Sequence, residues 1–288
     1  MDGMTTDIHA MSGDPTTSGD GATRHFTVHH DGVTIPVTRA GRGRPLVLCP
    51  GLCSTQADLH ELIELLRRDH DVLTFDLRGH GRTSAAGTYS FEAFAGDLAA
   101  VLAEARRLGP PSAPVLVGYS LGADLAVHHA SEHPGAVAGL VLIDGANPVP
   151  EPFVTEADLP AFRAMWEEAA AAQEALRGTA RQVSLTAQDI LDLNIEIDGV
   201  RAGILDRYRR IDCPISMIMS TSMAGADGGG PAARFNRNWR AGVERLVREL
   251  PRVSASWLDA DHGLVFTHAP RIAELVRRPR DPAGQPAC

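Results

Sequence analysis

The 288-residue chain is 44% hydrophobic and carries 27 basic against 36 acidic residues, a formal net charge of -9. Because this charge repels polyanions, we expect neither nucleic acid nor an anionic membrane surface as a partner. All 27 basic residues are arginine, and the absence of lysine excludes both a P-loop lysine and lysine Schiff-base chemistry.

The predicted elements begin after a polar segment, residues 1–23, which is rich in Gly, Ser and Thr and predicts a flexible tail. This segment lacks the apolar core of a signal peptide, and no run in the chain approaches the roughly 20 apolar residues that cross a membrane. The four cysteines are too few for a disulfide scaffold and lack the spacing of a metal site. We therefore expect a cytoplasmic protein without metal or cofactor, and the arginine-only usage suggests a bacterium with a GC-rich genome.

Strands and helices alternate over the first half of the chain. Residues 25–41 predict two short strands joined at Asp31-Gly32. Buried-strand runs follow at RPLVLCPG, DVLTFDL, PVLVGYS and GLVLID, and amphipathic helices are expected over 56–69, from Ser90 and from Leu121. Strands that are apolar on both faces and alternate with helices indicate a parallel sheet covered on both sides.

Residues 149–210 interrupt this alternation with a proline-rich entry and then helical stretches around Met165 to Leu176 and Ile190 to Tyr208. We interpret the segment as an inserted helical cap. Strand and helix patterns return with CPISMIMST, a helix bearing Phe235 and Trp239 on its apolar face, RVSASWLD and a last helix from Pro270. The expected organisation is one core domain with one insertion: core 24–148 and 211–278, cap 149–210, and a C-terminal tail 279–288.

The stretch VLVGYSLGA places Ser120 between a buried strand and a helix, flanked by Gly118 and Gly122. Glycines at these positions let strand and helix approach while the serine projects at the carboxyl edge of the sheet, as in a nucleophile elbow. A serine hydroxyl is a weak nucleophile, so this interpretation needs a base. His262, in LDADHGLVF after the last predicted strand, has the right place in the chain order Ser, Asp, His.

With two further motifs, the chain resembles the α/β-hydrolase fold superfamily over about residues 24 to 278. LVLCPGLCST resembles the oxyanion loop after the third strand, and FDLRGHGRTS closely matches the D-x-R-G-x-G-x-S signature. The resemblance implies a mostly parallel eight-stranded sheet flanked by helices, an inserted helical cap, and a serine hydrolase that works through an acyl-serine, as esterases, thioesterases and lactonases do. It also implies an oxyanion hole made by the backbone N–H groups of Leu52 and Leu121, although Pro50 stands where the family usually has histidine.

The acid of the catalytic triad has two candidates. Asp227 stands four residues before Pro231 and echoes the family's D-x-x-x-P pattern after the seventh strand. Asp144 closes GLVLID at the end of the sixth strand, from which some family members supply the acid. The resemblance favours Asp227 and keeps Asp144 as the alternative. Because the nucleophile position holds Ser120 and not aspartate, the haloalkane dehalogenase and epoxide hydrolase activities of this fold are disfavoured.

The cap is expected to form the walls of the substrate pocket, with substrate-binding residues Phe153, Phe162, Met165 and Trp166. Such walls suit a medium-sized, largely apolar small molecule and do not choose among ester, thioester and lactone. Two other functions stay open: a protein that has kept the fold but lost hydrolysis, as a ligand receptor or cofactor-free cyclase, and a cofactor-free perhydrolase with the same triad. The sequence does not indicate an oligomeric state.

Overall fold

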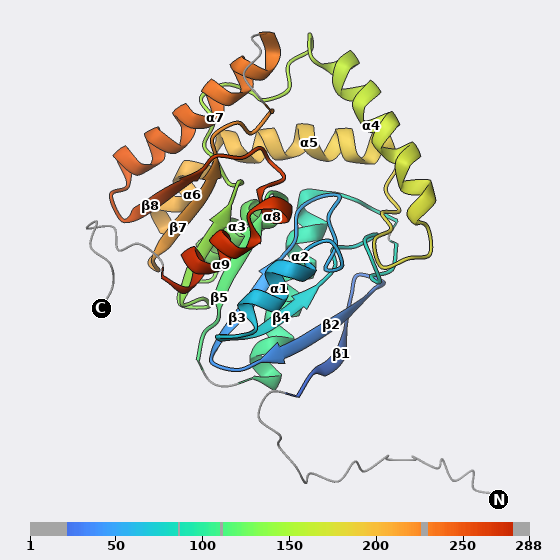
Figure 1. Cartoon of the computed structure of the whole chain (residues 1–288), viewed down its shortest axis with the longest axis vertical. Coiled ribbons are helices and arrows are strands. Elements are labelled where there is room, and N and C mark those ends of the chain that lie inside the picture. The colour runs from blue at the N-terminus through green and yellow to red at the C-terminus, as the bar shows by residue number, and fades with distance from the viewer. Residues whose placement is uncertain (1–21, 86, 110–111, 226–229, 279–288) are drawn as a thin grey trace, which may run out of the picture.

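An eight-stranded sheet forms the centre of the computed structural model, which describes residues 22–85, 87–109, 112–225 and 230–278 (Figure 1). The strand order is β1-β2-β4-β3-β5-β6-β7-β8. The β1–β2 and β2–β4 pairs are antiparallel, and all other neighbours are parallel, which confirms the expected fold class. The strands are β1 (Arg24–His30), β2 (Val33–Gly41), β3 (Arg44–Cys49), β4 (His70–Phe75), β5 (Val115–Tyr119), β6 (Gly139–Ile143), β7 (Ile215–Ser220) and β8 (Val253–Leu258).

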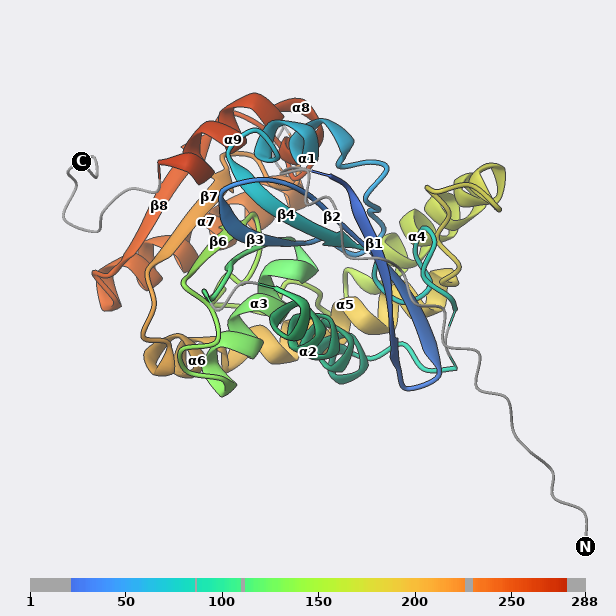
Figure 2. The ribbon, with the colours of Figure 1, turned by 90° about the horizontal axis from the view of Figure 1, so that it is seen from below.

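Helices cover both faces of the sheet, as Figure 2 shows from below. Because successive strand residues point to opposite faces, Leu116 of β5 joins the core beneath α2 and α3, whereas Val117 joins the core beneath α1, α8 and α9. The strands between the two layers are therefore apolar on both faces, as a buried parallel sheet requires. These helices are α1 (His60–Leu66), α2 (Phe91–Leu108), α3 (Leu121–Glu132), α8 (Leu264–Thr267) and α9 (Ala269–Arg277), and α7 (Gly230–Glu249) precedes β8.

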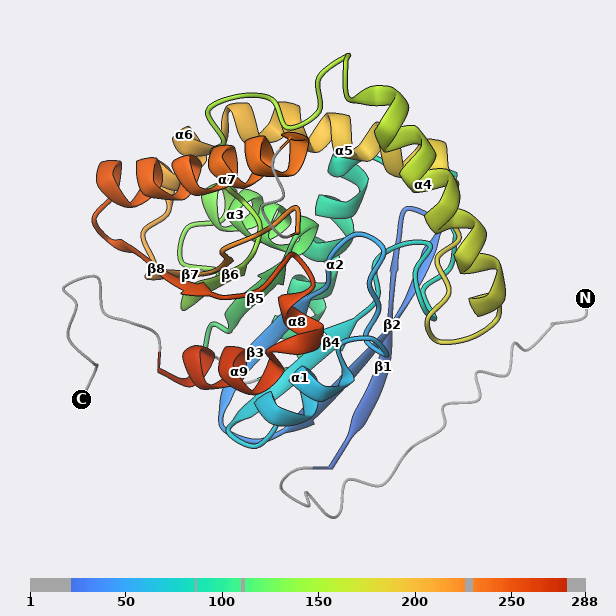
Figure 3. The ribbon, with the colours of Figure 1, turned by 45° about the horizontal axis from the view of Figure 1, so that its top comes forward.

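The segment between β6 and β7 is helical and lies along one end of the sheet beside α7 (Figure 3). Its connection to the core includes two hydrogen bonds with the loop after β4, from Ser184 N–H to the Gly79 carbonyl at 2.8 Å and from Gly81 N–H to the Gln182 carbonyl at 2.9 Å. The single helix expected from Ile190 to Tyr208 is divided at Gly203. The division into core and cap stays a prediction. The elements of this segment are α4 (Leu159–Gln173), η1 (Glu174–Leu176), α5 (Ala187–Ala202) and α6 (Ile204–Arg210).

Candidate active site

Ser120 occupies a strained turn between β5 and α3. Its backbone has φ 51° and ψ -118°, in a region that L-residues seldom adopt. Close packing imposes this turn, because a Cβ at Gly118 would collide with the Gly122 carbonyl and a Cβ at Gly122 would collide with the Cys49 carbonyl. The two glycines thus let the strand and the helix approach, and the turn leaves Ser120 at the carboxyl end of β5.

His262 lies between Ser120 and a buried carboxylate. Its Nε2 is 3.0 Å from Ser120 Oγ, and its Nδ1 is 2.8 Å from Asp144 Oδ2. Because an ionised carboxylate only accepts, Nδ1 carries the proton and Nε2 is left to accept from the serine hydroxyl. The Tyr119 hydroxyl donates to the backbone carbonyl of His262 at 2.8 Å. The structure thus brings the expected nucleophile and base into hydrogen-bond contact.

The acid that meets His262 is Asp144, the alternative candidate. Asp227, which the motif favoured, lies outside the described residues. The Nδ1 of His262 lies 2.8 Å from Asp144 Oδ2, so the described geometry supports Asp144, and the role of triad acid stays a prediction. The reason for this contact is the sheet register: Tyr119 of β5 pairs with Ile143 of β6, so the residues that follow these two strands leave the sheet side by side.

Asp144 is fully buried and has further donors around it. Ser220 donates its backbone N–H to Oδ1 at 2.9 Å and its hydroxyl to Oδ2 at 2.7 Å, and Trp239 donates its indole Nε1–H to Oδ1 at 3.0 Å. Burial alone would raise the pKa of Asp144, but the hydrogen bonds and charge of His262 and the bonds from Ser220 hold that pKa below its ordinary value. The carboxylate is therefore ionised at neutral pH and available to stabilise an imidazolium.

The expected oxyanion loop follows β3. Leu121 is the first residue of α3, so its N–H has no acceptor within the helix. On the other side, Cys53 has a φ of 62°, and its N–H donates to His80 Nε2 at 3.0 Å. His80 donates its Nδ1–H to the Arg78 carbonyl at 2.9 Å. His80 therefore braces the loop in which Pro50 has replaced the usual histidine, and the oxyanion roles of Leu52 and Leu121 stay a prediction.

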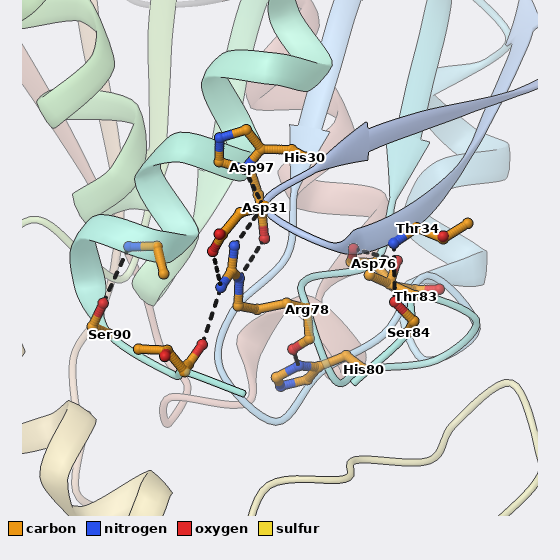
Figure 4. A network of polar contacts seen from close by, with 12 residues as sticks. His30, Asp31, Thr34, Asp76, Arg78, His80, Thr83, Ser84, Ser90 and Asp97 are labelled. Atoms are coloured by element: carbon orange, nitrogen blue, oxygen red, sulfur yellow. Dashed lines mark hydrogen bonds and ion pairs between the residues drawn. The ribbon is translucent and has the colours of Figure 1, made fainter. Parts of the chain in front are cut away.

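His80 can accept this bond because it is neutral. Burial lowers the pKa of His80 to about 4, against a smaller opposing effect of the Arg78 carbonyl. Arg78 itself is fully buried and donates Nε and Nη2 to Asp97 of α2 at 2.7 and 2.8 Å (Figure 4). His30 adds a 2.8 Å contact with Asp97. The D-x-R-G-x-G motif thus anchors His80 and, through it, the oxyanion loop.

Two of the expected substrate-binding residues pack against α7. Phe153 stacks on Phe235 with ring centroids 4.6 Å apart and meets Trp239 edge-on at 6.0 Å. Phe162 meets Phe235 edge-on at 5.9 Å. The structure thus places Phe153 against the tryptophan that donates to Asp144.

The other two lie on α4. Met165 is 45% exposed, whereas Trp166 packs partly buried against the main core. The indole Nε1 of Trp166 is buried and has no hydrogen-bond partner within the described part of the chain. Contact of these four side chains with a substrate stays a prediction.

A cavity of about 510 Å³ lies at the opposite end of the sheet. Its walls include Leu46 near the start of β3, Asp71 near the start of β4 and His133 just beyond the end of α3. Because Ser120 follows the carboxyl end of β5, this cavity at the amino ends of the strands is separate from the candidate active site.

Ser220 and Trp239 contact Asp144 in the candidate site, and the sequence did not reveal these contacts. Trp239 was expected on the apolar face of its helix, where it does lie, with 2% of its surface exposed. Helical periodicity reports which face is buried and carries no signal for an indole N–H bound to a carboxylate 95 residues earlier in the chain. Ser220 is the last residue of β7, and its position at the carboxyl end of a buried strand was the only sequence signal that it could lie near the site.

No helix within the described ranges is long and apolar enough to span a bilayer. Among the same residues there is no group of three or more His, Cys, Asp or Glu side chains suited to a metal ion. Burial raises the pKa of the Cys53 thiol to about 12, so this cysteine within the expected oxyanion loop is a thiol at neutral pH.

Comparison with known proteins identifies similar sequences. A family model described as alpha/beta hydrolase fold matches residues 44–188. The chain is 30% identical over 106 residues to the sn-1-specific diacylglycerol lipase ABHD11 of Danio rerio, covering 36% of this chain and 32% of the relative. It is 33% identical over 127 residues to a non-heme haloperoxidase of Rhodococcus erythropolis, covering 43% of this chain and 45% of the relative. These matches therefore span less than half of each relative's length.

Solved structures match over most of the chain. A carboxylesterase of the thaumarchaeon Nitrososphaera gargenis has a TM-score of 0.66 at 18% identity, covering 88% of this chain and 96% of its own. The thioesterase domain from the curacin biosynthetic pathway has a TM-score of 0.60 at 19% identity, covering 89% of this chain and 99% of its own. At such identities the likeness is one of fold.

Proposed function

The chain belongs to the alpha/beta hydrolase fold family, and we propose that it is a serine hydrolase acting on an ester, thioester or lactone of a medium-sized, largely apolar small molecule. The observation that carries the proposal is the chain of contacts from Ser120 Oγ to His262 Nε2 at 3.0 Å and from His262 Nδ1 to Asp144 at 2.8 Å. Relatives whose names describe a diacylglycerol lipase and a carboxylesterase are consistent with this chemistry.

The first half of the reaction forms an acyl-serine. His262 Nε2 takes the hydroxyl proton as Ser120 Oγ attacks the carbonyl carbon, and the carbonyl π electrons move to its oxygen. The backbone N–H groups of Leu52 and Leu121 hold the resulting oxyanion. When the carbonyl re-forms, the bond to the leaving group breaks and that group takes the proton from His262.

The second half returns the enzyme to its starting state. A water molecule gives a proton to His262 Nε2 and attacks the acyl carbon, and collapse of the second oxyanion releases the acid while Ser120 regains its proton. Throughout, Asp144 stays ionised, because the bonds that lower its pKa persist while His262 carries its extra proton. It orients the ring and stabilises the imidazolium.

A second candidate is supported by similarity to non-heme haloperoxidases from Rhodococcus erythropolis and Mycobacterium phage D29. Perhydrolysis uses the same acyl-serine, with hydrogen peroxide in place of water as the second nucleophile, and releases a peracid. Peroxide-dependent halogenation of a dye in the presence of acetate separates this activity from simple ester hydrolysis.

The test of the main proposal is intact-mass analysis after exposure to a fluorophosphonate probe. We expect one adduct on Ser120, absent in Ser120→Ala and greatly slowed in His262→Ala. Ser131→Ala is the matched control, since Ser131 is a buried serine at the far end of α3, and it should label like wild type. A folded wild-type protein that forms no adduct would contradict the proposal and favour a ligand receptor or cofactor-free cyclase.

A further inference from the structure

Trp239 of α7 contacts Asp144 at the carboxylate oxygen that His262 does not bind. The residue is 2% exposed, and its Nε1–H donates to Asp144 Oδ1 at 3.0 Å, where the Ser220 N–H also donates, while His262 and the Ser220 hydroxyl bind the other oxygen, Oδ2. A carboxylate held at both oxygens cannot rotate about its Cβ–Cγ bond without losing donors. The indole therefore adds to Ser220 in restricting the orientation in which Asp144 meets His262.

Arg201 of α5 links this tryptophan to the helix that follows the nucleophile. Its guanidinium binds both oxygens of Asp124, at 3.0 and 2.7 Å, and its Cζ lies 5.3 Å from the centroid of the Trp239 ring. Asp124 is fully buried on α3, one helical turn after Ser120. A bidentate pair in such a place is geometrically specific, and a cation over an indole face is attracted to it.

The surroundings of Arg201 show why it stays in this position. The Arg201 side chain is 12% exposed, and the Asp124 side chain is fully buried. Asp198, one turn earlier on α5, accepts the Val154 N–H at 2.7 Å, next to Phe153, whose ring meets Trp239 edge-on. The charged groups that face Arg201 are thus Asp124 and, at longer range, Asp198 and Asp144. All three are acidic, so their charge stabilises the Arg201 cation in this buried position, and Asp124 is the partner that it binds directly.

We propose that Trp239 is a positioning residue for the triad acid, and that Arg201, from the segment between β6 and β7, seats Trp239 against the nucleophile helix. The inference rests on the proposed function in taking Asp144 as the acid of a working triad. It assigns the inserted segment a part in aligning the catalytic groups, in addition to any contact with substrate.

Trp239→Phe tests the first part, because it keeps an aromatic ring beneath Arg201 and removes only the indole donor. We expect labelling of Ser120 by the fluorophosphonate to slow about tenfold, as loss of one hydrogen bond to a charged group can do. The proton NMR signal of the His262 Nδ1–H, identified by its absence in His262→Gln, should move. Trp257→Phe is the matched control: Trp257 also lies under an arginine, with Arg240 Cζ 4.9 Å from its ring centroid, but stands on β8. It should change neither readout.

The NMR signal separates the two proposals. If wild type does not label, the hydrolase proposal fails, and movement of the signal in Trp239→Phe but not in Trp257→Phe still supports the positioning role. If Trp239→Phe keeps both the wild-type signal and the wild-type labelling rate, the positioning role is wrong, whatever the protein hydrolyses.

Arg201 needs a paired variant, because Arg201→Met alone would leave Asp124 as a buried unpaired carboxylate and destabilise the fold. The double variant Arg201→Met with Asp124→Asn removes both charges and should label several-fold more slowly than wild type. If Arg201 acts through Trp239, adding the pair to Trp239→Phe should slow labelling no further. If the slowing is fully additive, Arg201 does not act through Trp239, and its contribution is the packing of α3 alone.

Discussion

The two sides of Ser120 are held in different ways. On the oxyanion side, the Cys53 N–H of the loop after β3 donates to His80 Nε2 at 3.0 Å, while Gly51 pairs with Ser54 and Gln56 pairs with Asp76 elsewhere in the loop. On the acid side, Asp144 receives hydrogen bonds from Ser220, Trp239 and His262, which come from three separate elements. The difference teaches that the Cys53 N–H beside Leu52 relies on one neutral imidazole as its acceptor, whereas the Asp144 carboxylate is held by several donors at once.

The largest effect should come from the acid itself. Asp144→Asn keeps the shape of the side chain but removes the charge that stabilises the His262 imidazolium, and we expect fluorophosphonate labelling to slow about 10⁴-fold. Asp227→Asn, the matched control, should label within about twofold of wild type. If Asp227→Asn labels far more slowly than wild type and Asp144→Asn does not, Asp227 is the acid, and the donors around Asp144 have no part in the comparison of the two sides. Circular dichroism of both variants shows whether either has lost its fold.

A smaller effect should come from the oxyanion side. His80→Leu leaves the Cys53 N–H without its acceptor, and we expect labelling to slow about tenfold, less than the loss of a direct oxyanion donor. His80→Gln retains a carbonyl oxygen as an acceptor and should recover part of the rate. Equal rates in the two variants would show that packing at this position matters and the hydrogen bond does not.

The smallest effect should appear in the pH dependence of stability. Burial lowers the pKa of both His80 and His129 to about 4, against about 6.5 in an unfolded chain. Between these pH values only the unfolded state binds the proton. The contribution of each histidine to the free energy of unfolding is therefore fully present above about pH 6.5 and is lost as pH falls towards 4. Lowering the pH from 7 to 5.5 should cost about 1 kcal/mol for each histidine.

Urea unfolding at the two pH values measures this loss, and His129→Asn should remove about half of the part due to the two histidines. The acid side loses stability in the same direction but at lower pH: the lowered pKa of Asp144 gives stability that is present above about pH 4 and disappears only as pH falls further. An unchanged pH dependence in His129→Asn would contradict the assignment.

The parts of the site that were predictable are those set by local chain geometry. Ser120 could be identified because Gly118 and Gly122 must be glycine for the strand and helix to approach, and this requirement is visible within five residues. His262 followed from chain order. The choice between Asp144 and Asp227 was not local, because the contact of Asp144 with His262 depends on the pairing of β5 with β6, whereas the motif with a matching proline pointed to the loop after β7.

The fold was predictable to a similar degree. Alternating apolar strands and amphipathic helices predicted the parallel sheet, but periodicity continued through Gly203, where the chain divides α5 from α6. Arg201 lies two residues before Gly203, and no motif or periodicity in the sequence marked it as part of the site. Its partner Asp124 is equally unmarked, because burial of a charged pair depends on tertiary packing.

The hydrogen bond from the Tyr119 hydroxyl to the His262 carbonyl has a consequence for heat inactivation. Tyr119 is the last residue of β5, so the loop that carries His262 is fastened to a central strand of the sheet, directly before Ser120. Such a strand opens only when the whole domain unfolds. Loss of activity on heating should therefore coincide with the global melting transition, whereas in Tyr119→Phe activity should disappear several degrees earlier.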